Sequence, residues 1–176
     1  MKSALIYTLA AACFLLVACN KNPADKAKAG QPREVPKLVA AEADNLVSDA
    51  TFAIQIRDYA RAEKSLARAV ELRPDFPEWW LSLGSACKRQ SKIGDARSAY
   101  KKALALYEKR YAATADVADV QQQIIMLVLL GREDEARKLL ERSRQKQPDQ
   151  PVLKRMSEVK IVDQLLGDPS IQQLKL

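Results

Sequence analysis

The 176-residue chain is predicted to be an all-α protein built from stacked helical hairpins. Its composition favours helices, because Ala, Leu, Lys, Arg and Glu dominate while aromatic residues make up only 6%. From Leu38 onward no segment alternates apolar and polar residues over the length of a strand, whereas apolar residues recur at helical spacing. A hydrophobic fraction of 48% and a charged fraction of 29% are typical of a globular chain rather than a disordered one.

A repeat organises the helical region. Three small or apolar positions recur with separations of 34 and then 40 residues. They are Ala62, Leu66 and Ala69, then Ala96, Tyr100 and Ala103, then Ala136, Leu140 and Ser143. The spacing resembles that of the tetratricopeptide repeat (TPR), with copies at about 43–76, 77–110 and 117–150 within a repeat region of residues 38–150. The six extra residues before the third copy are expected to lengthen the connection around Tyr107–Asp116.

The copy at 77–110 carries the resemblance best. Its matching positions are Trp80, Leu83, Gly84, Cys87, Ala96, Tyr100 and Ala103. The resemblance implies a TPR-type α-solenoid of about three helix-turn-helix repeats. Small residues (Gly84, Ala96, Ala103) would let two antiparallel helices approach closely, and bulky ones (Trp80, Leu83, Tyr100) would fill the space between repeats. Because one repeat cannot bury its own apolar face, the repeats must stack.

The C-terminal part is predicted to close the stack. Residues 151–176 are expected to form a capping helix and a tail. Five apolar residues of 151–166 share one helical face: Val152, Met156, Val159, Val162 and Leu166. The cap is expected to cover residues 124–130, seven consecutive apolar residues that leave no polar face. Core is favoured for that segment, and an open binding groove is the alternative.

The N-terminus is predicted to be a targeting segment. Lys2 is followed by an apolar run at 4–18, about 22 Å long as a helix and therefore short for a membrane span. The run ends in Leu16-Val17-Ala18-Cys19, which resembles the lipobox of bacterial lipoproteins. The resemblance implies a signal peptide at 1–18 and lipidation of Cys19. An ordinary signal peptide and an uncleaved anchor are the alternatives.

The lipobox also implies a location. Residues 19–37 would then be a lipidated cysteine followed by a flexible, polar tether with three prolines. Asn20 in place of Asp favours the outer membrane of a Gram-negative envelope, with the domain facing the periplasm. Cys87 would be the one cysteine left after lipidation, and a free thiol in an oxidising compartment is safest when buried.

The TPR resemblance also implies a function, because such domains usually bind peptides or protein segments on the concave surface lined by the first helix of each repeat. In the best copy the groove positions are Glu78, Leu81, Ser82, Ser85, Lys88 and Arg89. In the first copy they are Asp44, Val47, Ser48, Thr51 and Gln55, and in the third Gln121, Gln122, Ile125, Val128 and Leu129. Lys88 and Arg89 resemble the basic residues of a carboxylate clamp. Thr51 and Gln55 do not complete the clamp, so a solvated basic helix end is favoured.

Positive charge is concentrated in residues 88–110, with eight cations against two acids. The alternative function is therefore a membrane-surface or glycan binder that uses this basic face. A merely solubilising face is the commonest explanation of such a run. Nucleic acid is not expected as a partner, because an exported protein rarely meets it.

Catalysis is not expected. The chain has no histidine, and its five glycines are too far apart for a phosphate-binding loop. No cofactor, metal or small-molecule substrate is expected. The sequence therefore predicts a non-catalytic protein–protein interaction scaffold or adaptor in the bacterial envelope, with a partner bound in the groove.

Overall fold

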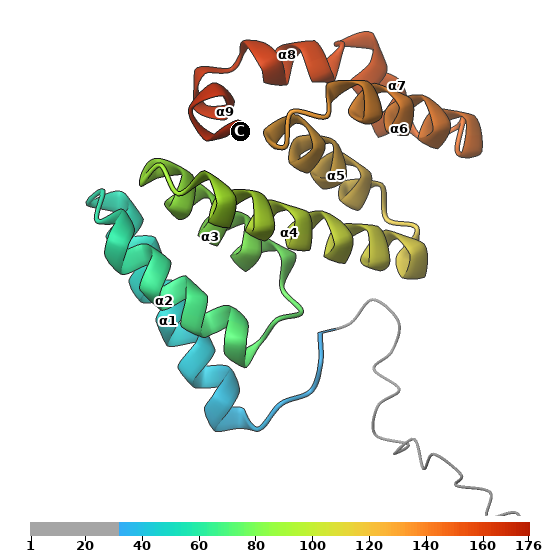
Figure 1. The fold of residues 1–176 in the computed structure, drawn as a ribbon. Helices are drawn as coiled ribbons and strands as arrows, with labels where there is room; N and C mark the ends of the chain where they lie inside the picture. The colour runs from blue at the N-terminus through green and yellow to red at the C-terminus, as the bar shows by residue number, and fades with distance from the viewer. Residues whose placement is uncertain (1–31) are drawn as a thin grey trace, which may run out of the picture.

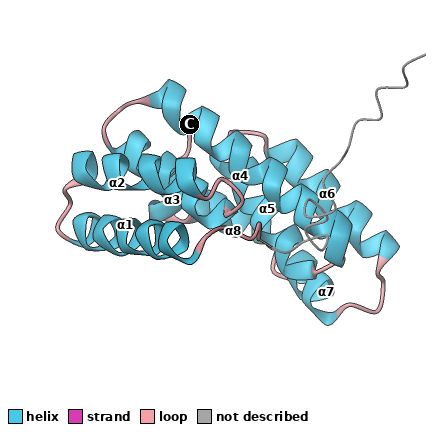
Figure 2. Cartoon of the chain, turned by 90° about the horizontal axis from the view of Figure 1, so that it is seen from below, coloured by secondary structure: helices cyan, strands magenta, loops and turns pink. Residues whose placement is uncertain are grey.

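A computed structural model describes residues 32–176 of the chain. Within that range every regular element is a helix, and no strand is present (Figure 2). The predicted all-α class is confirmed. The predicted signal peptide, Cys19 and most of the tether lie outside the described residues.

Three helical hairpins make up most of the described chain (Figure 1). The first pairs α1 (Lys37–Gln55) with α2 (Tyr59–Leu72), the second pairs α3 (Pro77–Arg89) with α4 (Ile93–Thr114), and the third pairs α5 (Val117–Leu129) with α6 (Glu133–Lys146). Neighbouring hairpins stack, because α2 packs against α3 and α4 packs against α5. The result is the predicted TPR-type solenoid.

The turn inside each hairpin has the same backbone conformation. One residue of each turn has a positive φ: 61° at Arg57, 62° at Ser91 and 72° at Gly131. The amide of the following residue donates to a carbonyl five residues earlier, as in the Schellman ending of a helix. The pairs are Asp58 to Ala53, Lys92 to Cys87 and Arg132 to Leu127. The separations of 34 and 40 residues found in the side-chain pattern therefore return in the backbone.

Close contact between α3 and α4 depends on a missing side chain. A Cβ atom on Gly84 would lie 2.5 Å from two ring carbons of Tyr100 and 3.2 Å from the carbonyl oxygen of Ala96. Tyr100, Ala96 and Ala103 are fully buried, and Leu83 is buried beside them. Trp80 is half-buried and contacts both buried clusters of the solenoid, one centred on α1–α4 and one on α4–α8.

The six extra residues do not lengthen a connection, as the sequence suggested, but a helix. α4 runs for 22 residues, against 14 for α2 and 14 for α6, and only Ala115 and Asp116 separate it from α5. Tyr107 is buried in the extension, which explains why the helix continues there. Asp95 lies in the first turn of α4, where the negative charge of its side chain interacts favourably with the helix dipole and stabilises the helix.

The predicted single capping helix is three short helices: α7 (Pro151–Glu158), α8 (Ile161–Gly167) and α9 (Pro169–Leu174). Lys160 breaks the first from the second by adopting a left-handed conformation, with φ at 48°. Of the five apolar residues predicted to share one face, Met156 and Val162 are buried, Leu166 is half-buried, and Val152 and Val159 are exposed. The chain then turns back, and its last described residues lie beside α5 instead of at the end of the stack (Figure 1).

The described N-terminal arm does not leave the domain directly. The amide of Arg33 donates to Asp75 Oδ2 at 2.7 Å, in the loop between α2 and α3. Arg73 of the same loop lies 3.7 Å from Asp75 and over the ring of Phe76. Among residues 32–176, no helix combines the length and the apolarity that crossing a bilayer requires.

Candidate functional site

The six predicted groove residues of the second repeat lie along one face of α3, which we call the α3 face. Their spacing of three and four residues puts them above one another on the helix. Glu78 and Arg89 at the two ends are exposed, and the four between them are half-buried. The structure thus brings these side chains together on one helix. Different residues contact the two ends of the α3 face.

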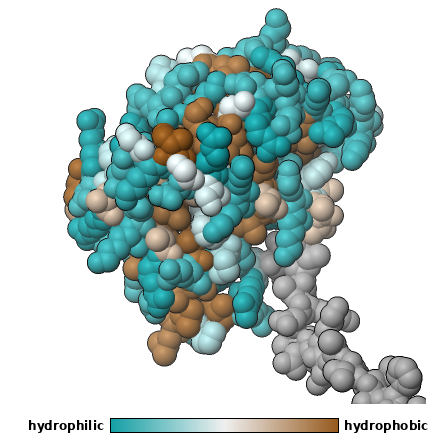
Figure 3. Space-filling model, viewed as in Figure 1, coloured by the Kyte–Doolittle hydropathy of each residue, from teal (hydrophilic) through white to brown (hydrophobic). Residues whose placement is uncertain are grey.

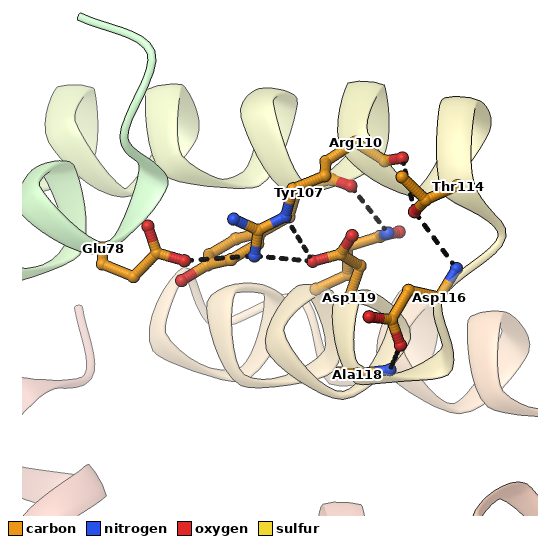
Figure 4. Close-up of polar contacts among 8 residues, drawn as sticks. Glu78, Tyr107, Arg110, Thr114, Asp116, Ala118 and Asp119 are labelled. Carbon is orange, nitrogen blue, oxygen red and sulfur yellow. Dashed lines mark hydrogen bonds and ion pairs between the residues drawn. The ribbon is translucent and has the colours of Figure 1, made fainter. Parts of the chain in front are cut away.

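At the N-terminal end of the α3 face, a charged network joins three helices (Figure 4). Arg110 of α4 donates from Nε to Asp119 Oδ1 of α5 at 2.9 Å, and from a terminal nitrogen to Glu78 Oε1 of α3 at 3.1 Å. The guanidinium also lies over the ring of Tyr107, 5.1 Å from its centre. The added turns of α4 are what carry Arg110 into this position.

Burial decides the electrostatics of this network. The Asp119 side chain is 3% exposed, and its Oδ2 atom is buried without a hydrogen-bond partner in the described chain. The hydrogen bond to Asp119 raises the pKa of Arg110 further above its ordinary value. Burial raises the pKa of Tyr107, so its hydroxyl stays neutral. The network therefore links the second and third repeats through a partly buried, charged hydrogen bond, and Glu78 lies at its exposed edge.

The middle of the α3 face is weakly polar. The hydroxyls of Ser82 and Ser85 donate to the carbonyls of Glu78 and Leu81 on their own helix, at 3.0 and 2.9 Å. The Ser82 oxygen can still accept from a ligand, whereas the Ser85 oxygen lies 3.5 Å from the hydroxyl of Tyr100, which can donate to it. Leu81 packs against the apolar cluster of α4–α8. A partner would thus meet short side chains over an apolar base.

At the C-terminal end, the α3 face is covered by the chain's own tail. Arg89 donates to the side-chain oxygen of Gln173 at 2.5 Å, and the hydroxyl of Tyr100 lies 3.3 Å from the carbonyl oxygen of Leu174. The amide of Leu176 donates to the carbonyl of Leu129 on α5 at 2.9 Å. Helix α9 therefore contacts the first helices of both the second and the third repeat.

The groove positions of the third repeat are only partly available. Val128 and Leu129 are fully buried, so they belong to the core and not to a groove. The same holds for most of 124–130, in which only Ile125 and Leu130 are half-buried. The segment is covered from the C-terminal side by α8 and α9. The expected groove residues of α1, in contrast, are exposed apart from Val47, which is half-buried.

The basic stretch at 88–110 is partly neutralised. Lys92 forms an ion pair with Glu63 at 2.6 Å, and Arg110 belongs to the charged network. Lys102 lies over the ring of Trp80, 4.1 Å from its centre. Three further cations, Arg97, Lys101 and Lys109, are exposed on α4. The net positive face is therefore narrower than the sequence count suggests.

Cys87 is 2% exposed, and burial raises the pKa of its thiol to about 11. A neutral thiol is a poor nucleophile. In the described part of the chain, no group of three or more acidic or cysteine side chains is placed to hold a metal ion.

The comparisons with known proteins agree with this geometry. The family model of the tetratricopeptide repeat matches residues 50–120, which span α2, α3 and α4 and the adjoining ends of α1 and α5. The fold is a TPR solenoid. A search of curated proteins found no match to the chain. TPR repeats generally mediate protein–protein interaction, which is consistent with a scaffold role, and the TPR fold is typically non-catalytic.

The sequence did not predict two features of this site, the charged network at one end of the α3 face and the tail at the other. Arg110 and Asp119 lie on either side of a helix break, and nothing in their spacing predicts that they meet. The sequence predicted a short tail after the capping helix, but not that this tail forms a helix and contacts α3 and α5. Its signal was present, because Asp168-Pro169 is a helix start and the apolar Ile171 and Leu174 follow with a spacing of three residues.

Proposed function

We propose that this chain is a lipid-anchored envelope protein whose TPR solenoid binds a protein partner through the α3 face. The observation that carries the proposal is the α3 face itself: short hydroxyl side chains and Lys88 over the apolar base of Leu81. Such a surface suits an extended or helical segment, because peptide groups can bond the hydroxyls while apolar side chains cover the base. Catalysis has no part in the proposal.

The anchor is inferred from the lipobox resemblance at 16–19. Several acyl chains on one residue hold a protein at a membrane stably, whereas a single chain does so only marginally. Mass spectrometry of the purified protein should find an N-terminal peptide that begins at Cys19 and carries acyl chains. The Cys19→Ser variant should lose the acyl mass and leave the membrane fraction. An unmodified N-terminus in the wild type would contradict the proposed lipid anchor, and it would leave the proposal of a partner on the α3 face unaffected.

The partner can be sought by photo-cross-linking in cells. A photoreactive benzoyl-phenylalanine is placed at Ser82 on the α3 face or at Ser98, which is exposed on α4. We expect one protein to be captured from position 82 and not from position 98. Introducing Lys88→Glu should reduce the capture, because it reverses charge on the α3 face while leaving the described ion pairs in place.

The opposite pattern would favour the alternative function. Capture at 98 alone, or salt-sensitive binding to anionic vesicles, would point to the exposed cations of α4. The two functions respond differently to salt, because exposed charges are screened beyond roughly 4 Å at 0.5 M salt whereas apolar contacts persist. The neutralised cations described above make this alternative the weaker one.

A further inference from the structure

We infer that the tail, residues 168–176, is an internal ligand of the solenoid, and that the partner binds by presenting a short helical segment with the tail's own pattern. This inference rests on the proposed function, since it names the chemistry of the partner for the same surface. The pattern is apolar at the positions of Ile171, Leu174 and Leu176, with an amide or acidic group two residues after the first and a cation before the last.

The apolar part of the pattern comes from the packing of the tail. Ile171 and Leu174 pack against the apolar cluster of α4–α8, and Leu176 packs against that cluster and against the cluster of α1–α4 as well. Trp80 is the other half-buried residue of the described chain that contacts both clusters. The tail therefore inserts its last side chain at the junction of two repeats, which is where a TPR ligand would gain most apolar contact.

The polar part comes from three contacts at defined positions. Gln173 accepts from Arg89, Lys175 Nζ lies 2.5 Å from Glu133 Oε1, and the Leu176 amide donates to the Leu129 carbonyl. The bond from Lys175 also lowers the pKa of Glu133, so the carboxylate stays charged. Charged and directional contacts of this kind select a register, and they would select the same register in a partner.

The tail is attached to the solenoid differently from every other described element. Helix α9 contains no buried residue, whereas each of α1–α8 has at least one. Its apolar side chains are half-buried, as those of a bound peptide are, and it is joined to α8 only through Asp168. It therefore lies on the surface of the solenoid, and its release would uncover apolar side chains of α3–α5 without withdrawing a buried side chain of its own.

The test measures binding of a second copy of the tail. A fluorescein-labelled peptide with the sequence of residues 168–176 is titrated with purified full-length protein, and its anisotropy is followed. The tail of the protein is weakened by Ile171→Asp together with Leu174→Asp. The matched control is Ser170→Asp, which adds charge to the exposed N-terminal turn of α9 but keeps the apolar contacts. Circular dichroism checks that each variant is folded.

We expect the doubly substituted protein to bind the peptide at least about tenfold more tightly than the wild type, because the attached tail competes at high effective concentration. The Ser170→Asp protein should behave like the wild type. A peptide that carries both aspartates should not bind. A folded double variant that ignores the peptide would overturn the inference, as would a wild type that binds it equally well. A wild-type dimer that the double variant loses would assign the surface to a second copy instead.

A second measurement covers the case in which the double variant does not fold. Hydrogen exchange of the wild-type protein is followed at the amides of Lys175 and Leu176 and at that of Arg132, which bonds inside the α5–α6 turn. Excess unlabelled peptide should accelerate exchange in the tail and leave Arg132 unchanged. Tail amides that exchange together with Arg132, with or without peptide, would make the tail an integral part of the fold and overturn the inference.

The two proposals can fail separately. Capture of a partner at position 82 without peptide binding would retain the proposed function and remove the inference. Peptide binding without any captured partner would leave a solenoid that recognises its own tail and would count against the adaptor role.

Discussion

At the scale of single residues, the small positions of the repeat pattern reflect how closely two helices can approach. Gly84 faces the ring of Tyr100 with no room for a further carbon atom. The equivalent positions in the other repeats hold Ala50 and Ile124, both buried, so those hairpins meet their neighbours with larger side chains. The second repeat is therefore the one in which the sequence pattern was clearest, because its geometry tolerates the fewest alternatives.

Replacing Gly84 with alanine should destabilise the protein by roughly 1–3 kcal/mol, because the new Cβ would overlap the Tyr100 ring. Gly94 is the matched control. A Cβ there meets nothing within 4 Å, so Gly94→Ala should be neutral or stabilise by up to about 1 kcal/mol through helix propensity. Urea unfolding followed by circular dichroism measures both. Equal effects of the two substitutions would contradict the close contact.

Cys87 gives a prediction about pH. Its folded pKa is about 11 against an ordinary 9.0, so the thiolate is disfavoured in the folded state. The resulting stability is fully present below pH 9 and is lost as the pH rises towards 11. With Cys13 and Cys19 changed to serine, iodoacetamide should label Cys87 at pH 8 only after urea unfolds the protein. Rapid labelling of the folded protein at pH 8 would show that the thiol is accessible.

At the scale of elements, the extension of α4 has the clearest structural role. It adds turns beyond the repeat pattern, and those turns hold Tyr107 in the core and bring Arg110 between Glu78 and Asp119. The sequence predicted where the six extra residues lie but placed them in a connection. The longer separation between repeats shows that residues are added, and it does not show that they continue a helix. Tertiary contacts, not local propensity, decide where this helix ends.

Removing the cation of this network should be costly. Arg110→Met leaves the buried Asp119 carboxylate unpaired, and we expect a loss of about 2–3 kcal/mol in the free energy of unfolding. Adding Asp119→Asn should restore much of that loss, since no buried charge then remains. The control is Arg61→Met, which breaks the more exposed pair with Asp49 and should cost clearly less than Arg110→Met. Additive effects of the Arg110 and Asp119 substitutions would rule out the pairing.

At the scale of the whole molecule, the sequence predicted the number of hairpins, their order and most of their core. This was possible because small and bulky residues recur at equivalent positions in each repeat. A pattern that would be weak in one hairpin therefore becomes recognisable when it occurs three times. Residues 151–176 are not part of the repeat, and there the prediction of one helix from a shared apolar face was wrong. The apolar periodicity continues through Lys160, but the left-handed conformation of Lys160 ends one helix before the next begins. The groove residues of α3 stay a prediction, while Val128 and Leu129 of α5 are core.

Unequal burial along the stack should give unequal stability. At the N-terminal edge Leu38 is 86% exposed and Phe52 and Ile56 are exposed as well, and apolar side chains are visible over the start of α1 (Figure 3). Most of α5 is buried. Amides of α1 should therefore exchange with solvent deuterium faster than those of α5, at a rate set by local opening. Exchange at a common rate would instead mean that the solenoid opens as one cooperative unit.

The contact between Arg33 and Asp75 has a mechanical consequence. The N-terminal arm reaches the domain at the loop between the first and second repeats, ahead of the first turn of α1. If the arm leads to the lipid anchor proposed above, tension along it would act first on this contact and on the neighbouring Arg73. A pull from the membrane would then detach the arm before it strained a helix, so the Arg33 contact would give way first and spare the repeats from unfolding.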